Sequence, residues 1–339
     1  MSTQSKSPPR AVLVEGFGAP SSFRLVDRDP GLPGPGEVRL RVKAAGISFV
    51  DVLTAEGGYQ IKPPLPFVPG SEHAGVIEAV GAGVPEHRIG ERVCAETGVG
   101  AFAEASIVPA AAARPLPPTM SFEEGAILLA SYSTSYHALV QRAELAAGQT
   151  LAVLGAGGAV GYAACEIGKA LGAKVIASVS TAEKRDLARR AGVDAVIDSS
   201  SPSWRDDLRD ANGGRPVDVV FDPVGGAMTE PAFRSLAWKG RLLVVGFAGG
   251  GIAKLPANLA LLKGASMVGV NVRGFAENEP DVAEANIEAL FALYREGKLH
   301  PPIARSYALE DFADAMVEAR SGRMAGRILI RMSDAISSL

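Results

Sequence analysis

The chain has 339 residues, of which 47% are hydrophobic and 21% are charged, and its formal net charge at pH 7 is -3. This length is typical of two domains, and this composition excludes a disordered chain, a collagen-like repeat and a strongly basic nucleic-acid-binding protein. The two cysteines, Cys94 and Cys165, are too few for a disulfide framework or a cysteine-rich zinc loop.

The first ten residues, MSTQSKSPPR, lack the apolar core of a signal peptide. No apolar run in the chain reaches the length of a transmembrane helix. Basic residues are scattered rather than grouped in blocks, which argues against a nucleic-acid surface. We therefore expect a soluble, cytoplasmic protein that binds neither a membrane nor nucleic acid.

Residues 11–128 alternate short apolar runs with glycine- and proline-rich turns, a pattern that predicts an irregular β-barrel-like domain. From Ser121 the pattern changes, because Ser121 and Glu124 resemble a capping box at the start of the first long helix, expected over 126–140. The first domain is therefore expected to end near residue 128. The clearest candidate strands within it are 11–14, 38–42, 74–80 and 92–95.

From residue 151 to about 271, buried strands alternate with amphipathic helices, which predicts a doubly wound parallel sheet with helices on both faces. This Rossmann domain is expected to span 129–297 and to include a helix over 280–296. The tail, 298–339, is expected to return to the first domain with a helix over 309–320 and a strand over 327–331. The expected strands of the parallel sheet are 151–154, 174–178, 195–198, 218–222, 241–245 and 267–270, and the helices between them lie around 158–171, 182–191, 203–210, 228–237 and 257–263.

A glycine-rich turn follows the first of these strands and begins the next helix. Glycines there allow the backbone to approach a pyrophosphate, and the helix N-terminus offers free N–H groups and a positive dipole end. The strand, the turn and the helix together predict a dinucleotide site. The residues expected to contact the cofactor in this turn are Gly155, Ala156, Gly158, Ala159, Val160 and Gly161.

The end of the second strand predicts which nicotinamide cofactor binds. An NAD site usually has an acidic residue there for the ribose hydroxyls, whereas this strand ends in Ser178 and is followed by Ser180, Lys184 and Arg185. Hydroxyls followed by two cations suit a 2′-phosphate, and each charge-assisted hydrogen bond would contribute about 1.5–3 kcal/mol. We therefore expect NADPH, although Glu183 is an alternative partner for a ribose hydroxyl.

Two further residues, Gly246 and Phe247, end a later strand of the same sheet. Parallel sheets bind their ligands at the carboxyl edge of the strands. We therefore expect both residues to contact the cofactor.

Five segments together carry a resemblance that covers nearly the whole chain: GISFVD at 46–51, PGSEHAGVIEAVGAGV at 69–84, GAGGAVG at 155–161, FDPVGG at 221–226 and VVGFAGG at 244–250. In this order the chain resembles the medium-chain dehydrogenase/reductase superfamily, and within it the zinc-free quinone oxidoreductase branch that includes the zeta-crystallin-like proteins. The resemblance implies a GroES-like catalytic domain formed by 1–128 and 298–339, beside the Rossmann domain. It also supports NADPH, because Lys184 matches a lysine that such reductases use on the 2′-phosphate.

The same resemblance identifies the positions of the zinc ligands in the superfamily's alcohol dehydrogenases. Those positions hold Ser48 and Ser71 here, and hydroxyls do not replace thiolate and imidazole. We therefore expect no catalytic metal. His73 lies close by, but a lone histidine without partner ligands is more often structural than metal-binding.

Without a metal, the chemistry is expected to come from bound NADPH, with hydride transfer to a quinone or an α,β-unsaturated carbonyl. By resemblance, Ser48 occupies the place of an asparagine near the nicotinamide, and Asp51 follows it in the same turn. Tyr59 and Thr134 match a pocket tyrosine and a threonine near the nicotinamide, and Arg320 in the tail is a further, looser cofactor match.

Two other functions remain open from the sequence. One is a zinc-free alcohol or enoyl-thioester reductase of the same superfamily. The other is a non-catalytic NADPH-binding protein, since some zeta-crystallin relatives are lens proteins or bind RNA. The resemblance also implies a homodimer, formed through an edge strand over 267–272.

Overall fold

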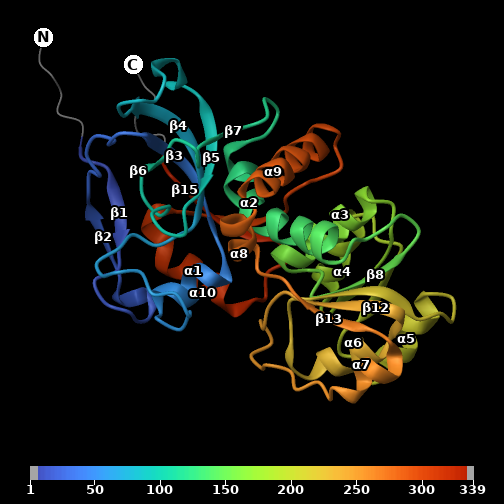
Figure 1. The fold of residues 1–339 in the computed structure, drawn as a ribbon. Helices are drawn as coiled ribbons and strands as arrows, with labels where there is room; N and C mark the ends of the chain where they lie inside the picture. The colour runs from blue at the N-terminus through green and yellow to red at the C-terminus, as the bar shows by residue number, and fades with distance from the viewer. Residues whose placement is uncertain (1–6, 334–339) are drawn as a thin grey trace, which may run out of the picture. The chain divides into compact units, whose positions relative to one another are not determined.

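The computed structural model describes residues 7–333, which divide into two compact units. The first unit comprises the described residues up to Ala130 and those from Pro302 onward. The second unit runs from Ser131 to Pro301. The chain therefore leaves the first unit once and returns to it (Figure 1).

The first unit is built on a seven-stranded sheet and a separate pair of strands, β1 and β2. The sheet has the order β14-β15-β3-β4-β5-β7, and β6 pairs with β3 outside this path. The tail strand β15 lies antiparallel to β3, so the end of the chain completes the sheet that the first part begins. The strands are β1 Arg10–Leu13, β2 Arg24–Asp27, β3 Glu37–Ile47, β4 Glu72–Val80, β5 Arg92–Glu96, β6 Ala105–Pro109, β7 Arg114–Pro115, β14 Ile303–Ala308 and β15 Arg327–Arg331.

Two helices pack on this sheet, α1 (Phe49–Ala55) and α10 (Phe312–Ser321). Their apolar residues, among them Val52 and Met316, share a core with the sheet residues Val42 and Ile330. Apolar side chains contributed by segments nearly 300 residues apart thus join the tail to the first part of the chain. The burial of this apolar surface is the main favourable term in that association.

The second unit contains the parallel sheet that the sequence predicts. Its strand order is β10-β9-β8-β11-β12-β13, and every pairing is parallel. Because the order reverses direction between β8 and β11, the sheet is doubly wound, with its switch point beside β8. The strands are β8 Thr150–Leu154, β9 Lys174–Val179, β10 Ala195–Asp198, β11 Val217–Asp222, β12 Leu236–Val244 and β13 Ser266–Gly269.

Helices cover both faces of the parallel sheet (Figure 1). One face packs against α5, α6 and α7, whose buried residues Trp204, Phe233 and Leu259 form a cluster with Leu154 and Leu242. The opposite face carries α3 and α4. The helices of this unit are α3 Ala159–Ala170, α4 Ala182–Arg190, α5 Trp204–Ala211, α6 Thr229–Arg234, α7 Asn258–Lys263, α8 Val272–Asn278 and α9 Pro280–Arg295.

Several element boundaries differ from the sequence-based prediction. The helix expected over 228–237 ends at Arg234, because β12 begins at Leu236 beside β11. The edge strand expected over 267–272 ends at Gly269, because α8 follows it and was not predicted. The side chain of Asn271 caps that helix by accepting from the N–H of Gly274 at 3.0 Å.

The helix α2 (Phe122–His137) leads from the first unit into the second. The predicted capping box is present at its start: the N–H of Glu124 donates to Ser121 Oγ at 3.1 Å, and the N–H of Ser121 donates to the Glu124 carboxylate at 2.9 Å. The helix begins earlier than the predicted residue 126 and continues as one π-helical turn, Ala138–Arg142. Within residues 7–333, no helix combines the length and the apolar character needed to cross a lipid bilayer.

Candidate functional site

The glycine-rich turn connects β8 to α3 at the switch point of the parallel sheet. Gly155 has a φ of 59°, which is in the region that favours glycine, and its carbonyl accepts from the N–H of Gly158 at 2.9 Å. A Cβ on Gly161 would lie 2.3 Å from that carbonyl oxygen. The first turn of α3 therefore passes so close to Gly155 that only glycine fits at position 161.

Gly158 is the N-cap residue of α3 and supplies no side-chain cap. Ala159, Val160 and Gly161 follow it as the first three residues of the helix. The N–H groups in the first turn of a helix have no intrahelical acceptor, and they form the positive end of the helix dipole. This turn fits the pyrophosphate of a dinucleotide, which would supply the missing cap.

The end of β9 is joined to the glycine turn through the backbone, since the N–H of Ala156 donates to the carbonyl of Ser178 at 3.3 Å. The Ser178 side chain is buried and its hydroxyl accepts from Trp204 Nε1 at 2.9 Å. No pattern in the sequence indicates this partner, which lies 26 residues further along the chain. Ser180, in contrast, is exposed just beyond the strand.

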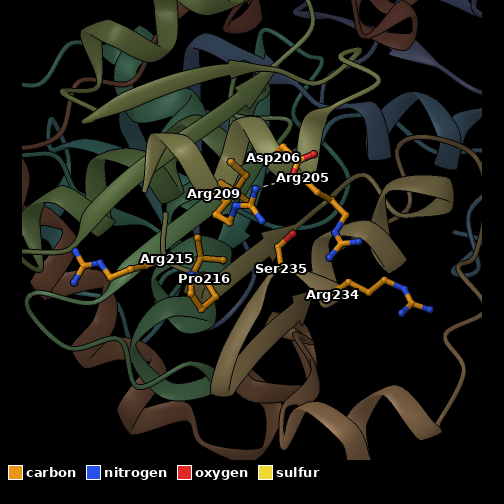
Figure 2. Close-up of a pocket in the computed structure, with 9 residues that line it drawn as sticks. Arg205, Asp206, Arg209, Arg215, Pro216, Arg234 and Ser235 are labelled. Atoms are coloured by element: carbon orange, nitrogen blue, oxygen red, sulfur yellow. Dashed lines mark ion pairs between the residues drawn. The ribbon is translucent and has the colours of Figure 1, made fainter. Parts of the chain in front are cut away.

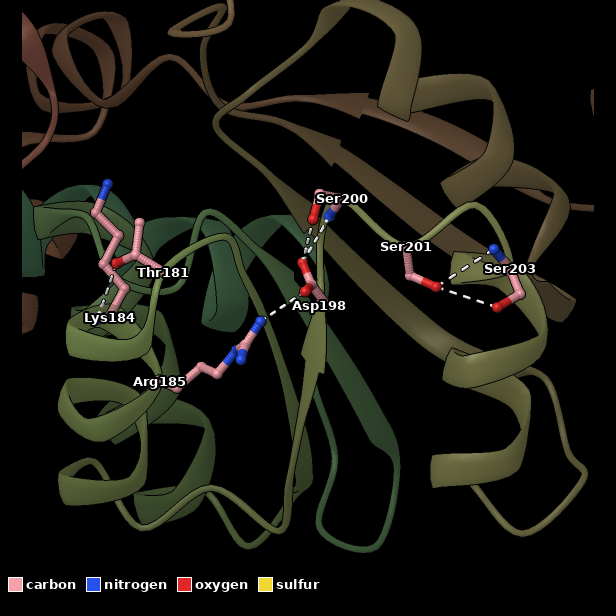
Figure 3. Close-up of polar contacts among 7 residues, drawn as sticks. All are labelled: Thr181, Lys184, Arg185, Asp198, Ser200, Ser201 and Ser203. Carbon is pink, nitrogen blue, oxygen red and sulfur yellow. Dashed lines mark hydrogen bonds and ion pairs between the residues drawn. The ribbon is translucent and has the colours of Figure 1, made fainter.

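The sequence predicts two cations near a 2′-phosphate, Lys184 and Arg185, and their side chains point in different directions (Figure 3). Both lie in the first half of α4, which Thr181 caps by accepting from the N–H of Lys184 at 3.3 Å. The stem of Lys184 crosses the glycine turn, because a Cβ on Gly157 would lie 2.5 Å from Lys184 Cγ. Burial lowers the pKa of Lys184 from its ordinary value. Arg185 instead reaches Asp198, with Nη2 2.6 Å from Oδ2.

Two loops at the carboxyl edge of β11 and β12 are packed against each other. Asp222 accepts from the N–H groups of Val224 and Gly225 and from the Thr229 hydroxyl, which fixes the loop after β11. A Cβ on Gly225 would lie 2.9 Å from the Phe247 ring. Gly246 lies beside Pro223 in the same arrangement, and the Phe247 side chain remains 46% exposed. The two predicted residues thus lie at the edge where parallel sheets bind ligands.

Thr134 is half-buried on α2, and its neighbour Ser135 connects this helix to the glycine turn. The Ser135 hydroxyl donates to the carbonyl of Val160 at 2.8 Å. This bond holds the second half of α2 against the first turn of α3. The sequence did not single out Ser135, because a serine on a helix face has no distinctive pattern.

In the first unit, Ser48 and Asp51 form the capping box of α1. The N–H of Asp51 donates to Ser48 Oγ at 3.0 Å, and the N–H of Ser48 donates to Asp51 Oδ2 at 2.7 Å. Both predicted residues are therefore already engaged in fixing the start of this helix. Their side chains hold the local backbone, and the structure shows no further role for them.

A buried ion pair lies next to this helix in the first unit. Glu72 is fully buried and accepts from Arg327 Nη2 at 2.9 Å and from the N–H of Ala130 at 2.8 Å. Burial raises the pKa of the Glu72 carboxyl, whereas Arg327 and the Ala130 N–H favour its charged form. The carboxylate thereby joins β4, β15 and α2.

The remaining predicted residues of the first unit lie just after α1 and on α10. Tyr59 is half-buried after α1, and its N–H donates to the carbonyl of Leu53 at 3.2 Å. Arg320 on α10 donates to Glu56 at 3.1 Å, and its guanidinium lies 4.6 Å from the centre of the Phe49 ring. Because Arg320 holds both ends of α1, its contacts give no support to the expected cofactor role.

The residues around the superfamily's zinc position do not supply a ligand set. Ser48 is used as a helix cap. His73 is fully buried, with Nε2 2.8 Å from Ser106 Oγ, and burial lowers its pKa to about 4. Burial also raises the pKa of the Cys94 thiol to about 12. Across residues 7–333, no three His, Cys, Asp or Glu side chains are arranged to hold a metal ion.

The structure also gathers four arginines that appear scattered in the sequence (Figure 2). They line a hollow at the amino ends of β11 and β12, opposite the edge where parallel sheets bind ligands. Arg209 pairs with Asp206 at 3.1 Å, and Arg234 pairs with Glu230 at 2.7 Å. This hollow is therefore partly neutralised and separate from the glycine turn. Its arginines are Arg205, Arg209, Arg215 and Arg234.

Two family descriptions match the chain. Residues 34–118 match the alcohol dehydrogenase GroES-like domain, and residues 159–288 match the zinc-binding dehydrogenase family. The first match lies within the β-rich unit and the second covers most of the parallel-sheet unit. The two units are thus a GroES-like domain and a Rossmann domain.

Similar proteins extend over nearly the full chain. Quinone oxidoreductase-like protein 2 of Mus musculus is 35% identical over 95% of this chain and 92% of its own length. A quinone oxidoreductase of Pseudomonas aeruginosa is 33% identical over 95% of this chain and 99% of its own length. A mycobacterial protein solved in complex with NADPH has a TM-score of 0.86 at 28% identity, covering 95% of this chain and 99% of that one. The chain belongs to the medium-chain dehydrogenase/reductase superfamily, in its zinc-free quinone oxidoreductase branch.

Proposed function

We propose that this protein is an NADPH-dependent oxidoreductase that transfers hydride to a quinone or an α,β-unsaturated carbonyl without a metal. The main observation in favour of NADPH is that the stem of the Lys184 side chain lies over Gly157 in the glycine turn. No acidic side chain lies at the end of β9, where an NAD site usually has one, because the last two residues of this strand are Ser178 and Val179. The relative solved with NADPH supports the same choice.

The residues of this chain would bind and orient the cofactor. The N–H groups at the start of α3 would hold the pyrophosphate, and Lys184 with Ser180 would hold the 2′-phosphate. Gly246 and Phe247 lie at the carboxyl edge, where they would contact the remainder of the dinucleotide. Bound NADPH would supply the hydride.

The overall reaction balances without a metal or a covalent step. Reduction of a quinone takes the hydride from NADPH and one proton from Tyr59 or water, and gives the hydroquinone and NADP⁺. Charge that develops on the acceptor is delocalised onto a carbonyl oxygen. A simple ketone would need stronger polarisation, which a Lewis acid usually provides.

The metal-free part of the proposal is supported by the chemistry of the residues. Ser48 and Ser71 carry hydroxyls where the alcohol dehydrogenases carry a thiolate and an imidazole, and zinc strongly prefers the latter. Ser48 is also engaged as the N-cap of α1. We therefore propose that the acceptor is activated by its own conjugation.

The quinone class is favoured over acyl thioesters and alcohols by the names of the relatives from mouse and P. aeruginosa. A zinc-free alcohol or enoyl-thioester reductase remains the second candidate.

The homodimer and the cytoplasmic location also remain predictions. The dimer would form through β13, which among the described strands pairs only with β12 and exposes Met267.

The test is NADPH oxidation by the purified protein with a quinone, an enone, an acyl thioester or a ketone as the acceptor. We expect turnover with the first two, and a higher rate with NADPH than with NADH. Tyr59→Phe should lower kcat for the quinone by about tenfold or more while leaving the Kd for NADPH unchanged. The matched control is Tyr307→Phe, which removes a half-buried hydroxyl that bonds to Glu318 in the same unit. Turnover with the thioester alone would favour the second candidate.

A further inference from the structure

Arg185 and Asp198 form an ion pair beside the position proposed for the 2′-phosphate. Arg185 lies one residue after Lys184 on α4, yet its guanidinium points toward β10, with Nη2 2.6 Å from Asp198 Oδ2. The Lys184 side chain leaves the helix in a different direction (Figure 3). The two adjacent cations are therefore not equivalent, because Arg185 is directed to Asp198 whereas the stem of Lys184 lies over Gly157 in the glycine turn.

Asp198 is held in place by its own loop. Its other oxygen, Oδ1, accepts from the N–H of Ser200 at 2.9 Å and from the Ser200 hydroxyl at 2.6 Å. These two bonds keep the pKa of Asp198 below its ordinary value, so the carboxylate is charged at neutral pH. Arg185 thus faces an oriented carboxylate, and the pair is only partly exposed, at 35% and 38% of the two side chains.

The register of the sheet places this carboxylate near the ribose site. Asp198 is paired with Val179, the residue that directly follows Ser178 in β9. NAD-binding sheets usually carry their acidic residue at the end of the second strand. Here an acidic residue lies one strand further out, at the same edge, with Arg185 partly neutralising it.

We propose that Asp198 limits the preference of this site for NADPH by holding Arg185 away from the 2′-phosphate. The inference rests on the proposed NADPH site. A 2′-phosphate would have to compete with Asp198 for the guanidinium, and it would also be repelled by the carboxylate. The wild-type protein would therefore hold the 2′-phosphate of NADPH mainly through Lys184, with a lower affinity than two cations would provide.

Asp198→Asn tests this directly. An asparagine keeps an oxygen that accepts from Ser200 but no longer carries the charge that holds Arg185. We expect the Kd for NADPH to fall about tenfold, equivalent to about 1.4 kcal/mol, and the Kd for NADH to stay unchanged. The probes 2′,5′-ADP and 5′-AMP should respond in the same way as NADPH and NADH, since only the first carries a 2′-phosphate. Unchanged or weaker binding of NADPH, or an equal gain for NADH, would overturn the inference.

A second pair of variants separates Arg185 from a general effect of charge. In an Arg185→Gln background, Asp198→Asn should lose most of its effect on NADPH, and an undiminished effect would contradict the role of Arg185. Asp186→Asn is the matched control, because it removes a carboxylate from α4 whose partner is the exposed Arg189. That control should leave both Kd values unchanged.

These measurements distinguish the inference from the proposed function. The ratio of the wild-type Kd values for NADPH and NADH tests the proposed NADPH preference. The change in that ratio on Asp198→Asn tests the role of Asp198. Thermal unfolding of each variant verifies that the changes in affinity come from folded protein.

Discussion

Glu72 and Arg327, 255 residues apart in the chain, form an ion pair in the interior of the GroES-like domain, with Arg327 Nη2 2.9 Å from Glu72 Oε2. Their side chains are 1% and 5% exposed. The pair connects β4, from the first part of the chain, with β15, from its tail. The returning tail is therefore held by buried charge as well as by apolar packing.

Removing one member of this pair should be costly. Arg327→Met leaves the Glu72 carboxylate buried without its cation, and we expect the free energy of unfolding to fall by about 3–5 kcal/mol in urea denaturation. Arg331→Met, on the same strand, breaks a more exposed pair with Glu123 and should cost less than about 1 kcal/mol. Equal losses for the two variants would contradict a special role for the buried pair.

Lys184→Ala should weaken NADPH binding selectively. The variant would remove the charge-assisted hydrogen bond that we propose between Lys184 and the 2′-phosphate, which corresponds to about 1.5–3 kcal/mol of binding free energy. The Kd for NADPH should rise accordingly in a fluorescence titration, and the Kd for NADH should change little. Arg189→Ala, further along α4 and paired with Asp186, is the control that should affect neither. A parallel rise for both cofactors would exclude a specific contact with the phosphate.

Gly161→Ala should weaken the binding of NADPH and NADH to the same extent. The added Cβ would lie 2.3 Å from the carbonyl oxygen of Gly155, so the start of α3 must move away from the turn. We expect a loss of about 1–3 kcal/mol in stability, together with equal rises in the Kd values for NADPH and NADH. Gly269→Ala, where a Cβ meets nothing within 4 Å, is the control. A selective loss of NADPH alone would contradict the assignment of this turn to the shared pyrophosphate.

His73 should make the protein less stable in acid. Burial lowers its pKa from 6.5 to about 4. The unfolded chain therefore binds the proton more readily than the folded one, and stability falls as the pH decreases through this interval. The loss should be about 3 kcal/mol between pH 6.5 and pH 4.

The variant His73→Gln should reduce that pH dependence, measured as the difference in unfolding free energy between pH 7 and pH 4.5. His87→Gln alters an exposed histidine of the same unit and should leave the dependence as in the wild type. An unchanged dependence in His73→Gln would assign the acid sensitivity to other groups.

Much of the Rossmann domain could be predicted because its signals are local. The strands β8 and β9 and the turn between them are consecutive in the sequence, so their apolar runs and glycines define the unit directly. The helix α8 could not be predicted in this way, because it is short and its start depends on one Asn271 side chain. The π-helical turn after α2 likewise has no distinctive residue pattern.

The side-chain contacts of the site were harder to predict than its location. The sequence placed Ser178, Lys184 and Arg185 near one another, but not the partners that orient them. Trp204 engages the Ser178 hydroxyl and Asp198 engages Arg185, and both partners come from later elements of the sheet unit. Such contacts follow from the packing of several elements and are not visible in any one segment.

The most direct test of the whole account is the rate of NADPH oxidation by a quinone, measured on protein treated with a strong chelator and verified to contain no zinc. The account predicts full activity in this protein and no increase when Zn²⁺ is added back. Activity that disappears on chelation and returns only with Zn²⁺, or an absence of quinone-dependent NADPH oxidation in both preparations, would contradict it.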